Sequence, residues 1–279
     1  MRCDDDRIEI IVHGLSADWG SWEIVQATLV GFTHARRKHN PDLVALISGQ
    51  DYPVRDLAEW EKMAIAASGW IGEARPLNYR AHWGKRYGDG DDRLTRYTYR
   101  WFRSPAEVLG LRLPDPIDRV WRRARRAVAL RLEPMLSVRV VTRGRGTYYG
   151  VRRARSPFTS GRPCWFGAQW LAVRRHELDR LLDVDLAPGS RLWRLYRRSI
   201  IPDESALVTP LCWAGPPAAM PPVTHLRWDD ASDQVRIWER GDIREIVASG
   251  APFCRKVDPV RSSDLLDMLD RRSALGGAA

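Results

Sequence analysis

A strand, an amphipathic helix and a second apolar run follow one another near the start of the chain. Residues 7–14 (RIEIIVHG) alternate apolar and polar side chains, which predicts a strand. Residues 21–39 carry apolar side chains at helical spacing, with Ser21 as the expected N-cap. The run LVALIS (43–48) is short and continuously apolar, as buried parallel strands are. This strand–helix–strand order predicts an α/β fold.

The remainder of the chain predicts further helices and shows no linker on which to divide it. Apolar spacing favours helices within 51–67, 119–133, 170–185, 203–213, 242–250 and 263–272. Residues 75–118 are rich in Gly, Asp and Pro and predict long loops, and residues 225–241 predict a hairpin. The 279 residues, 44% of them hydrophobic, suffice for one large core. We therefore expect one α/β domain over 1–272 and a disordered tail at 273–279.

Composition restricts the compartment and the class of partner. No run of about 18 apolar residues is present, so we expect no transmembrane segment. The acidic N-terminus lacks the build of a signal peptide, and the four cysteines lack zinc-ligand spacing, which favours free thiols in the cytoplasm. The net charge of +10 implies an anionic partner: nucleic acid, an anionic membrane surface or a phosphorylated small molecule. Arginines gather at 119–133 and 143–156, where they could also be an ordinary solvated surface.

An acidic pair, Asp203 and Glu204, lies inside the segment RSIIPDESALVTPL (198–211). One interpretation is structural, because an acidic residue at a helix start accepts hydrogen bonds from free backbone N–H groups. The other is catalytic, with Glu204 as a general base. The pair alone favours the structural interpretation, so the choice depends on the motifs around it.

Those motifs occur in a recognisable order. ADWGSWEIVQATL is followed by LVALISGQDYPVR, WFGAQWLAVRR, IPDESALVTPL, LRWDD and APFCRKVDP. Together they resemble the glycosyltransferase family that contains core-2/I-branching N-acetylglucosaminyltransferases and peptide O-xylosyltransferases, over about residues 19–268. The resemblance implies a GT-A-like fold, in which a twisted, mainly parallel sheet flanked by helices binds a UDP-sugar at its carboxyl edge. It also implies an inverting reaction that forms a β-linkage.

The resemblance assigns a role to the residues that match the family's motifs. Glu204 matches the general base, which removes the proton of the acceptor hydroxyl. Arg255 and Lys256, in FCRK, match the cations that stabilise the departing UDP, so the family needs no metal. An Asp-x-Asp at Asp183 and Asp185 is better explained as a helix end than as a metal motif.

Four more residues match segments near the donor and the acceptor. Trp19 matches a tryptophan close to the donor site, where the alternative is a core residue. Asp51 follows the expected buried strand, at the edge where open α/β sheets bind ligands, or else closes an Asx-turn. Gln169 and Trp170 match a segment near the acceptor. Because the xylosyltransferase branch has an acidic residue in place of Gln169, this position argues for a different acceptor.

The match departs from the family at its start. The family begins with a strand that ends in His-x-Asp, whose acid is implied to contact uridine, about thirty residues before the tryptophan. Here only 18 residues precede Trp19, so the first βα unit is expected to be missing, either because the start lies upstream or because the chain is a shortened, inactive relative.

The sequence therefore favours a UDP-sugar-dependent transferase of N-acetylglucosamine or xylose type, acting on a glycan hydroxyl such as that of a bacterial envelope polysaccharide. The alternatives are a nucleic-acid-binding protein, with the clusters at 119–126 and 143–155 as its footprint, and an inactive glycan-binding relative.

Overall fold

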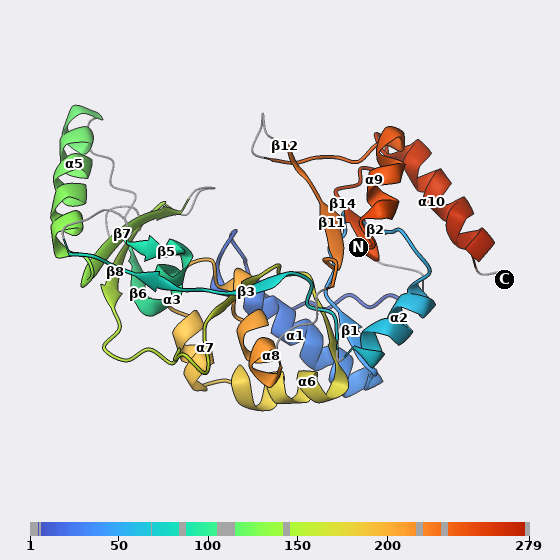
Figure 1. The fold of residues 1–279 in the computed structure, drawn as a ribbon, viewed down its shortest axis with the longest axis horizontal. Coiled ribbons are helices and arrows are strands. Elements are labelled where there is room, and N and C mark those ends of the chain that lie inside the picture. The colour runs from blue at the N-terminus through green and yellow to red at the C-terminus, as the bar shows by residue number, and fades with distance from the viewer. Residues whose placement is uncertain are drawn as a thin grey trace. The chain divides into compact units, whose positions relative to one another are not determined.

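The computed structural model describes residue 5 and residues 7–67, 69–83, 88–104, 115–141, 146–215, 220–229 and 234–276. It is a mixed α/β structure with several small sheets (Figure 1). Contacts divide the chain into two compact units, each assembled from three stretches. The first comprises Met1–His34, Pro76–Phe166 and Arg180–Pro210, and the second comprises Ala35–Arg75, Gly167–Asp179 and Leu211–Ala279. The chain passes between the units several times, so no single linker separates them. A division of this kind leaves no boundary that the sequence could show.

The first unit is built around a three-stranded antiparallel sheet in the order β6–β8–β7. Its strands are β6 (Tyr99–Arg103), β7 (Leu136–Val141) and β8 (Gly146–Arg152). Smaller elements of this unit are β4 (Tyr79–Arg80), β5 (Asp89–Gly90), η1 (Asp92–Leu94), α3 (Thr95–Thr98), α5 (Asp115–Leu132), the π-helical turn η2 (Leu181–Asp185), α7 (Arg191–Tyr196) and η3 (Pro202–Glu204). Figure 1 shows α5 beside this sheet, where it contacts β7.

One face of this sheet forms the core of the first unit. Tyr99, Trp101, Val141 and Ile200 are buried together there, and Trp19 and Tyr148 pack against them. Gly150 lies under the Trp101 ring, since a Cβ at this position would come within 2.7 Å of a ring carbon. The close approach of ring and backbone therefore requires glycine.

The second unit contains the parallel pair β11 (Thr224–Leu226) and β14 (Phe253–Arg255), with β2 (Asp51–Pro53) antiparallel to β14. A second, antiparallel pair joins β1 (Leu43–Ala45) to β10 (Ala172–Arg174). Its other elements are α2 (Leu57–Ala66), the hairpin β12 (Trp228–Asp229) and β13 (Gln234–Val235), η4 (Arg240–Asp242), α9 (Ile243–Ala248) and α10 (Ser263–Gly276).

Two apolar clusters support the strands of the second unit. Trp60 packs edge-on against both Trp70 and Phe253, with ring centroids 6.0 and 5.7 Å away. Trp238, fully buried, packs with Cys254 and with the inner side of α10 and α9. Five of the described elements begin in one unit and end in the other: α1 (Trp22–His39), β3 (Ala74–Pro76), β9 (Trp165–Gly167), α6 (Arg175–Arg180) and α8 (Val208–Ala214).

Three expectations from local pattern were wrong. Residues 8–18 form no regular element, and Val12 is 92% exposed, so the first strand is absent. The run at 43–48 yields only β1, which is antiparallel and partly exposed. Residues 172–174 form strand β10 where a helix over 170–185 was expected. In each case the alternation or apolarity is local, whereas a strand exists only where a partner accepts its backbone hydrogen bonds.

The expected loops and tail also need correction. Within residues 75–118, Tyr99–Arg103 form β6, an edge strand of the three-stranded sheet, and residues 105–114 lie outside the described part. Helix α10 continues to Gly276 and so includes part of the expected tail, while residues 277–279 are not described. Helices α1, α2 and α5 and the β12–β13 hairpin confirm their predictions.

Candidate functional site

The second unit brings together three residues that the sequence marked separately. Arg255 is the last residue of β14, and its guanidinium carbon lies 4.8 Å from the centre of the Trp170 ring. On the adjacent strand, Asp51 pairs with Arg255 in register, and Asp51 Oδ1 lies 3.5 Å from Arg255 Nη1. The guanidinium is therefore held between a carboxylate and an indole face, as arginines that recognise anions often are. Gln169 precedes Trp170 and is partly buried.

Asp51 acts on Arg255 from inside the protein. Its side chain has no exposed surface, and Oδ2 accepts hydrogen bonds from the Ser48 N–H at 2.6 Å and the Thr224 hydroxyl at 3.5 Å. Burial raises the pKa of the Asp51 carboxyl above its ordinary value, although the Ser48 N–H and the Arg255 charge oppose that shift. Asp51 thus closes a turn and orients Arg255, and a ligand would contact Arg255 instead.

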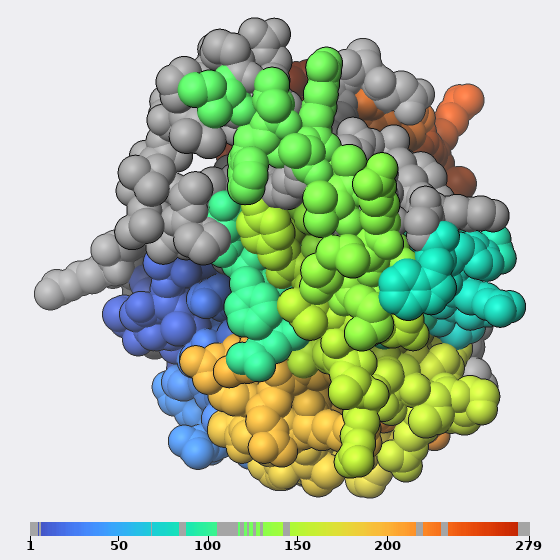
Figure 2. Space-filling model, turned by 90° about the vertical axis from the view of Figure 1, so that its left-hand side faces the viewer, coloured from blue at the N-terminus to red at the C-terminus, as the bar shows by residue number. Residues whose placement is uncertain are grey.

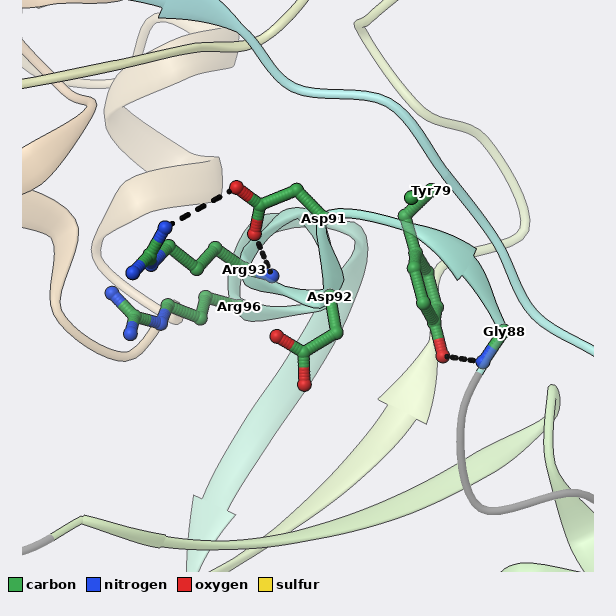
Figure 3. Close-up of a pocket in the computed structure, with 7 residues that line it drawn as sticks. Tyr79, Gly88, Asp91, Asp92, Arg93 and Arg96 are labelled. Carbon is green, nitrogen blue, oxygen red and sulfur yellow. Dashed lines mark hydrogen bonds and ion pairs between the residues drawn. The ribbon is translucent and has the colours of Figure 1, made fainter.

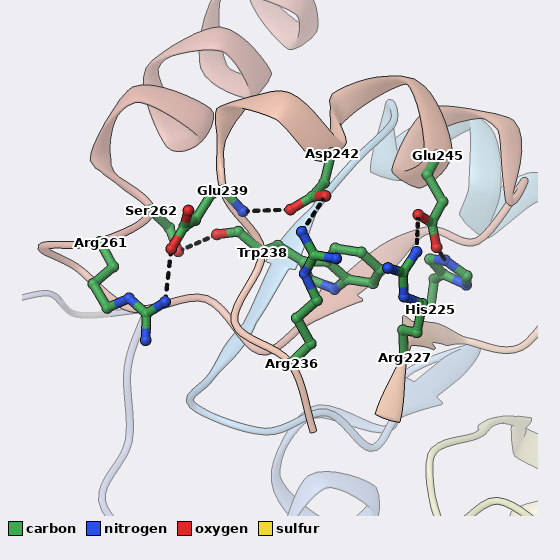
Figure 4. Close-up of polar contacts among 9 residues, drawn as sticks. All are labelled: His225, Arg227, Arg236, Trp238, Glu239, Asp242, Glu245, Arg261 and Ser262. Carbon is green, nitrogen blue, oxygen red and sulfur yellow. Dashed lines mark hydrogen bonds and ion pairs between the residues drawn. The ribbon is translucent and has the colours of Figure 1, made fainter. Parts of the chain in front are cut away.

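Backbone hydrogen bonds hold Lys256 against the segment 236–238, whose neighbours are joined by ion pairs. Its backbone N–H donates to the Arg236 carbonyl at 3.2 Å, and its carbonyl accepts from the Trp238 N–H at 2.9 Å. Figure 4 shows the polar contacts of this region: Arg236 with Asp242 at 2.8 Å, Arg227 with Glu245 at 2.7 Å, Arg261 with Glu239 at 2.7 Å, and Ser262 donating to the Trp238 carbonyl at 2.7 Å. Arg255 and Lys256 therefore lie on a backbone that is fixed on both sides.

In the first unit, Glu204 ends a strained turn. Ile201 adopts the left-handed region, with φ of 49° and ψ of 55°, which is costly for a β-branched residue. Gly20 stabilises this conformation, because its carbonyl accepts the Ile201 N–H at 3.0 Å. The Tyr97 hydroxyl donates to the Ile201 carbonyl, also at 3.0 Å. The turn η3 follows directly and projects Glu204 from a fixed position.

Glu204 is paired with an arginine that the sequence did not indicate. Arg96 Nη1 lies 2.5 Å from Glu204 Oε2, and the two side chains are only 22% and 30% exposed. No motif marks Arg96, which is one of 45 basic residues in the chain. Only the fold, which packs α3 against η3, selects it.

Arg96 also lines a hollow of about 650 Å³ within the first unit. The other lining residues are Tyr79, Gly88, Gly90, Asp91, Asp92 and Arg93 (Figure 3). Asp91 pairs with Arg93 at 3.3 Å, and Asp92 pairs with Arg139 at 2.8 Å. Because both carboxylates and guanidinium groups line it, the hollow offers both donors and acceptors to a hydroxyl-rich ligand.

Asp203 is a second titratable group on the same turn. Its side chain is buried, and Oδ1 has no hydrogen-bond partner within the described residues. Burial, reinforced by the neighbouring charge of Glu204, raises the pKa of Asp203 to about 6. Nothing in the acidic pair of the sequence distinguishes Asp203 from Glu204, and it is burial that gives Asp203 a titration of its own.

The remaining sequence candidates take structural positions. Trp19 packs against the core of the first unit, in line with the core alternative. Asp183 and Asp185 lie in the π-helical turn η2, where Asp185 Oδ2 accepts from Arg180 Nε at 3.0 Å, which supports the helix-end interpretation.

In comparisons with known proteins, no protein-family model matches the chain, and no curated protein sequence matches it significantly. Among the described residues, no helix has the length and apolar character needed to cross a bilayer.

Proposed function

We propose that this protein is an inverting glycosyltransferase that moves a sugar of the N-acetylglucosamine or xylose type from a UDP-sugar to a glycan hydroxyl, forming a β-linkage. The observation that carries the proposal is the cluster of Asp51, Trp170 and Arg255 in the second unit. These residues are far apart in sequence, and the resemblance to the branching N-acetylglucosaminyltransferase family marks each of them independently.

The position of the cluster supports a ligand site. Arg255 ends β14, and β14 pairs in parallel with β11, so Arg255 lies at the carboxyl end of a parallel pair, where open α/β sheets bind ligands. On this ground we also propose that the sheet containing β11 and β14 belongs to a GT-A-like fold. A guanidinium has five N–H donors, and the contact with Asp51 engages Nη1. We assign the others to the β-phosphate of UDP, with Lys256 as a second cation.

The proposed reaction is a direct displacement. Glu204 takes the proton of the acceptor hydroxyl as its oxygen forms a bond to the anomeric carbon, and the bond between that carbon and the UDP oxygen breaks. The electron pair remains on the β-phosphate, whose growing charge Arg255 and Lys256 stabilise without a metal ion. Arg96 engages Oε2 of Glu204, and we assign the proton transfer to Oε1.

We further propose that the enzyme is cytoplasmic, with a UDP-sugar as its donor and a glycan as its acceptor. The alternative of nucleic-acid binding rested on basic clusters at 119–126 and 143–155, and residues 143–145 of the second cluster lie outside the described part.

Calorimetry with UDP tests the donor site. The wild type should bind UDP equally with and without EDTA, and Arg255→Ala should weaken the affinity about tenfold or more, given the strength of charge-assisted hydrogen bonds. Arg244→Ala, at an exposed position on α9, is the matched control and should bind normally. Loss of binding in EDTA would contradict the metal-free site, and unchanged affinity in Arg255→Ala would contradict the phosphate role. Normal UDP binding without turnover of any UDP-sugar would identify an inactive relative.

A further inference from the structure

Helix α5 carries an apolar stripe that is exposed. The stripe consists of Ile117, Val120, Trp121, Val128 and Leu132, which are 55%, 67%, 55%, 56% and 38% exposed. At 3.6 residues per turn, these positions fall within an arc of about 120°. A helix with such a stripe normally turns it toward a protein core. Here the stripe faces outward, so it is available to something outside the described residues.

The same helix is strongly basic. It contains six arginines and two aspartates, a net charge of +4. Four of the arginine positions (119, 122, 125 and 126) lie on the arc opposite the apolar stripe or at its border. The remaining two, Arg123 and Arg131, are both exposed; Arg123 lies outside the arc of the stripe, and Arg131 lies within it in the last turn of the helix. An apolar stripe that contains tryptophan and is flanked by arginines is typical of helices that lie in the interface of an anionic membrane.

The adjacent sheet extends the apolar surface. Leu136 on β7 pairs with Val151 on β8. Tyr149, two residues before Val151 on β8, pairs with Phe102 on β6. The side chains of Leu136, Val151 and Phe102 therefore lie on one face of the sheet. They are 36%, 46% and 46% exposed, and Val140 on the same face is 66% exposed. The guanidinium of Arg100 lies over the Phe102 ring, 5.1 Å from its centre. Figure 2 looks onto this side of the molecule, where α5 (green) and the strands β7 and β8 (yellow-green) lie at the surface.

We propose that α5, together with the exposed face of the β6–β8–β7 sheet, binds the surface of an anionic lipid bilayer, with α5 lying in the plane of the interface. The charge complementarity comes from the arginines, which attract anionic headgroups. The anchoring comes from Trp121 and the aliphatic residues of the stripe, which enter the boundary of the acyl region. Six arginines exclude a spanning orientation, because each would be costly at the bilayer centre.

A nucleic acid is the less suitable partner for this surface. Its phosphates require cations and, for single strands, aromatic rings that stack on bases. They give no reason to keep Ile117, Val120, Val128 and Leu132 in solvent, where exposed aliphatic groups are unfavourable. A bilayer uses both the cations and the aliphatic side chains.

Vesicle sedimentation with the full chain tests the proposal. Binding is expected to vesicles with about one third phosphatidylserine or phosphatidylglycerol, to be much weaker on pure phosphatidylcholine, and to fall at high salt. Trp121→Glu with Val128→Glu should abolish binding, and Arg123→Glu with Arg131→Glu should weaken it at least about fivefold per residue. Val184→Glu, 63% exposed in the same unit, is the matched control and should bind normally. Equal binding of the Trp121→Glu, Val128→Glu variant and the wild type would overturn the proposal.

A probe on the helix gives a readout that does not depend on the stability of the charge variants. The probe is an NBD dye on Val120→Cys. The Cys3→Ser change removes a second labelling position, and the other three cysteines are buried. The dye at position 120 should show a blue shift and stronger emission with anionic vesicles, and the same dye on Val184→Cys should not. No change at position 120, or a response to short DNA duplexes and single strands in place of vesicles, would overturn the proposal. None of these measurements requires UDP or a sugar, so their failure is separate from that of the proposed transferase activity.

Discussion

Arg96 Nη1 lies 2.5 Å from Glu204 Oε2, joining two residues 108 positions apart in the chain. The pair fixes the carboxylate that follows the strained Ile201 turn, and its arginine also lines the hollow of the first unit. A change at either residue therefore acts on the turn and on the hollow together.

Replacing Arg96 by Met should destabilise the protein by about 1 to 2 kcal/mol, because Glu204 loses its partner in a site that is less than one third exposed. Urea unfolding at neutral pH measures this. Arg93→Met removes a longer contact, to Asp91 at 3.3 Å, made by an arginine that is more exposed than Arg96, and should cost less than about 0.5 kcal/mol. Equal losses in the free energy of unfolding for both variants would show that the Arg96–Glu204 contact stabilises the fold no more than the Arg93–Asp91 contact does.

Glu204→Gln keeps the shape of the side chain and removes its basicity. Transfer from a UDP-sugar should fall by about 10²- to 10⁴-fold, while the affinity for UDP stays within about twofold, since the carboxylate acts on the acceptor proton. Steady-state rates and calorimetry measure the two quantities, with Glu59→Gln on the exposed side of α2 as the control. A variant with near-normal turnover would remove Glu204 from the mechanism.

Asp203 should make stability depend on pH. Its pKa is raised from 3.8 to about 6 in the folded state, so the folded protein binds more protons than the unfolded chain between those values. Stability from this group is therefore greatest below about pH 4 and falls as the pH rises through about 6. Asp203→Asn removes the titration and should stabilise the protein at pH 8 by about 2 to 3 kcal/mol.

The measurement is urea unfolding of Asp203→Asn and the wild type at several pH values between 4.5 and 8. The difference between the two isolates Asp203 from the other carboxylates. A difference that does not change with pH would show that Asp203 titrates in the ordinary acidic range when folded.

Gly150→Ala should destabilise the first unit by about 1 to 3 kcal/mol, because the added Cβ would lie 2.7 Å from the Trp101 ring. Thermal unfolding measures the effect. Gly161→Ala, where a Cβ meets nothing within 4 Å, should be neutral. If Gly150→Ala unfolds at the wild-type temperature, the Trp101 ring is free to shift, and the core around it is looser than its contacts indicate.

Local signals predicted the helices well and the strands poorly. Helix α2 begins where Asp56 accepts hydrogen bonds from the N–H groups of Ala58 and Glu59, and every part of that signal lies within four residues. The apolar spacing of α1 and α5 is equally local. The stretch at 7–14 has the alternation of a strand but lies exposed, since alternation does not provide a partner strand.

The candidate site divides in the same way. Motifs identified Glu204, Asp51, Trp170 and Arg255 as residues with a possible role, but no motif contains Arg96, and none shows that Asp203 is buried. Asp51 was expected to contact the donor. Its side chain has no exposed surface, and it contacts Arg255 from the protein interior.

The sequence by itself determined where α1, α2 and α5 form, the basic charge and the amphipathic pattern of α5, because capping and periodicity depend on neighbours within one or two turns. Only the tertiary structure decided that the stripe of α5 is exposed, that Asp203 is buried and that Arg255 meets Asp51 and Trp170. Burial and ion pairing depend on residues that are distant in sequence, and their positions follow from packing that no short window of sequence contains.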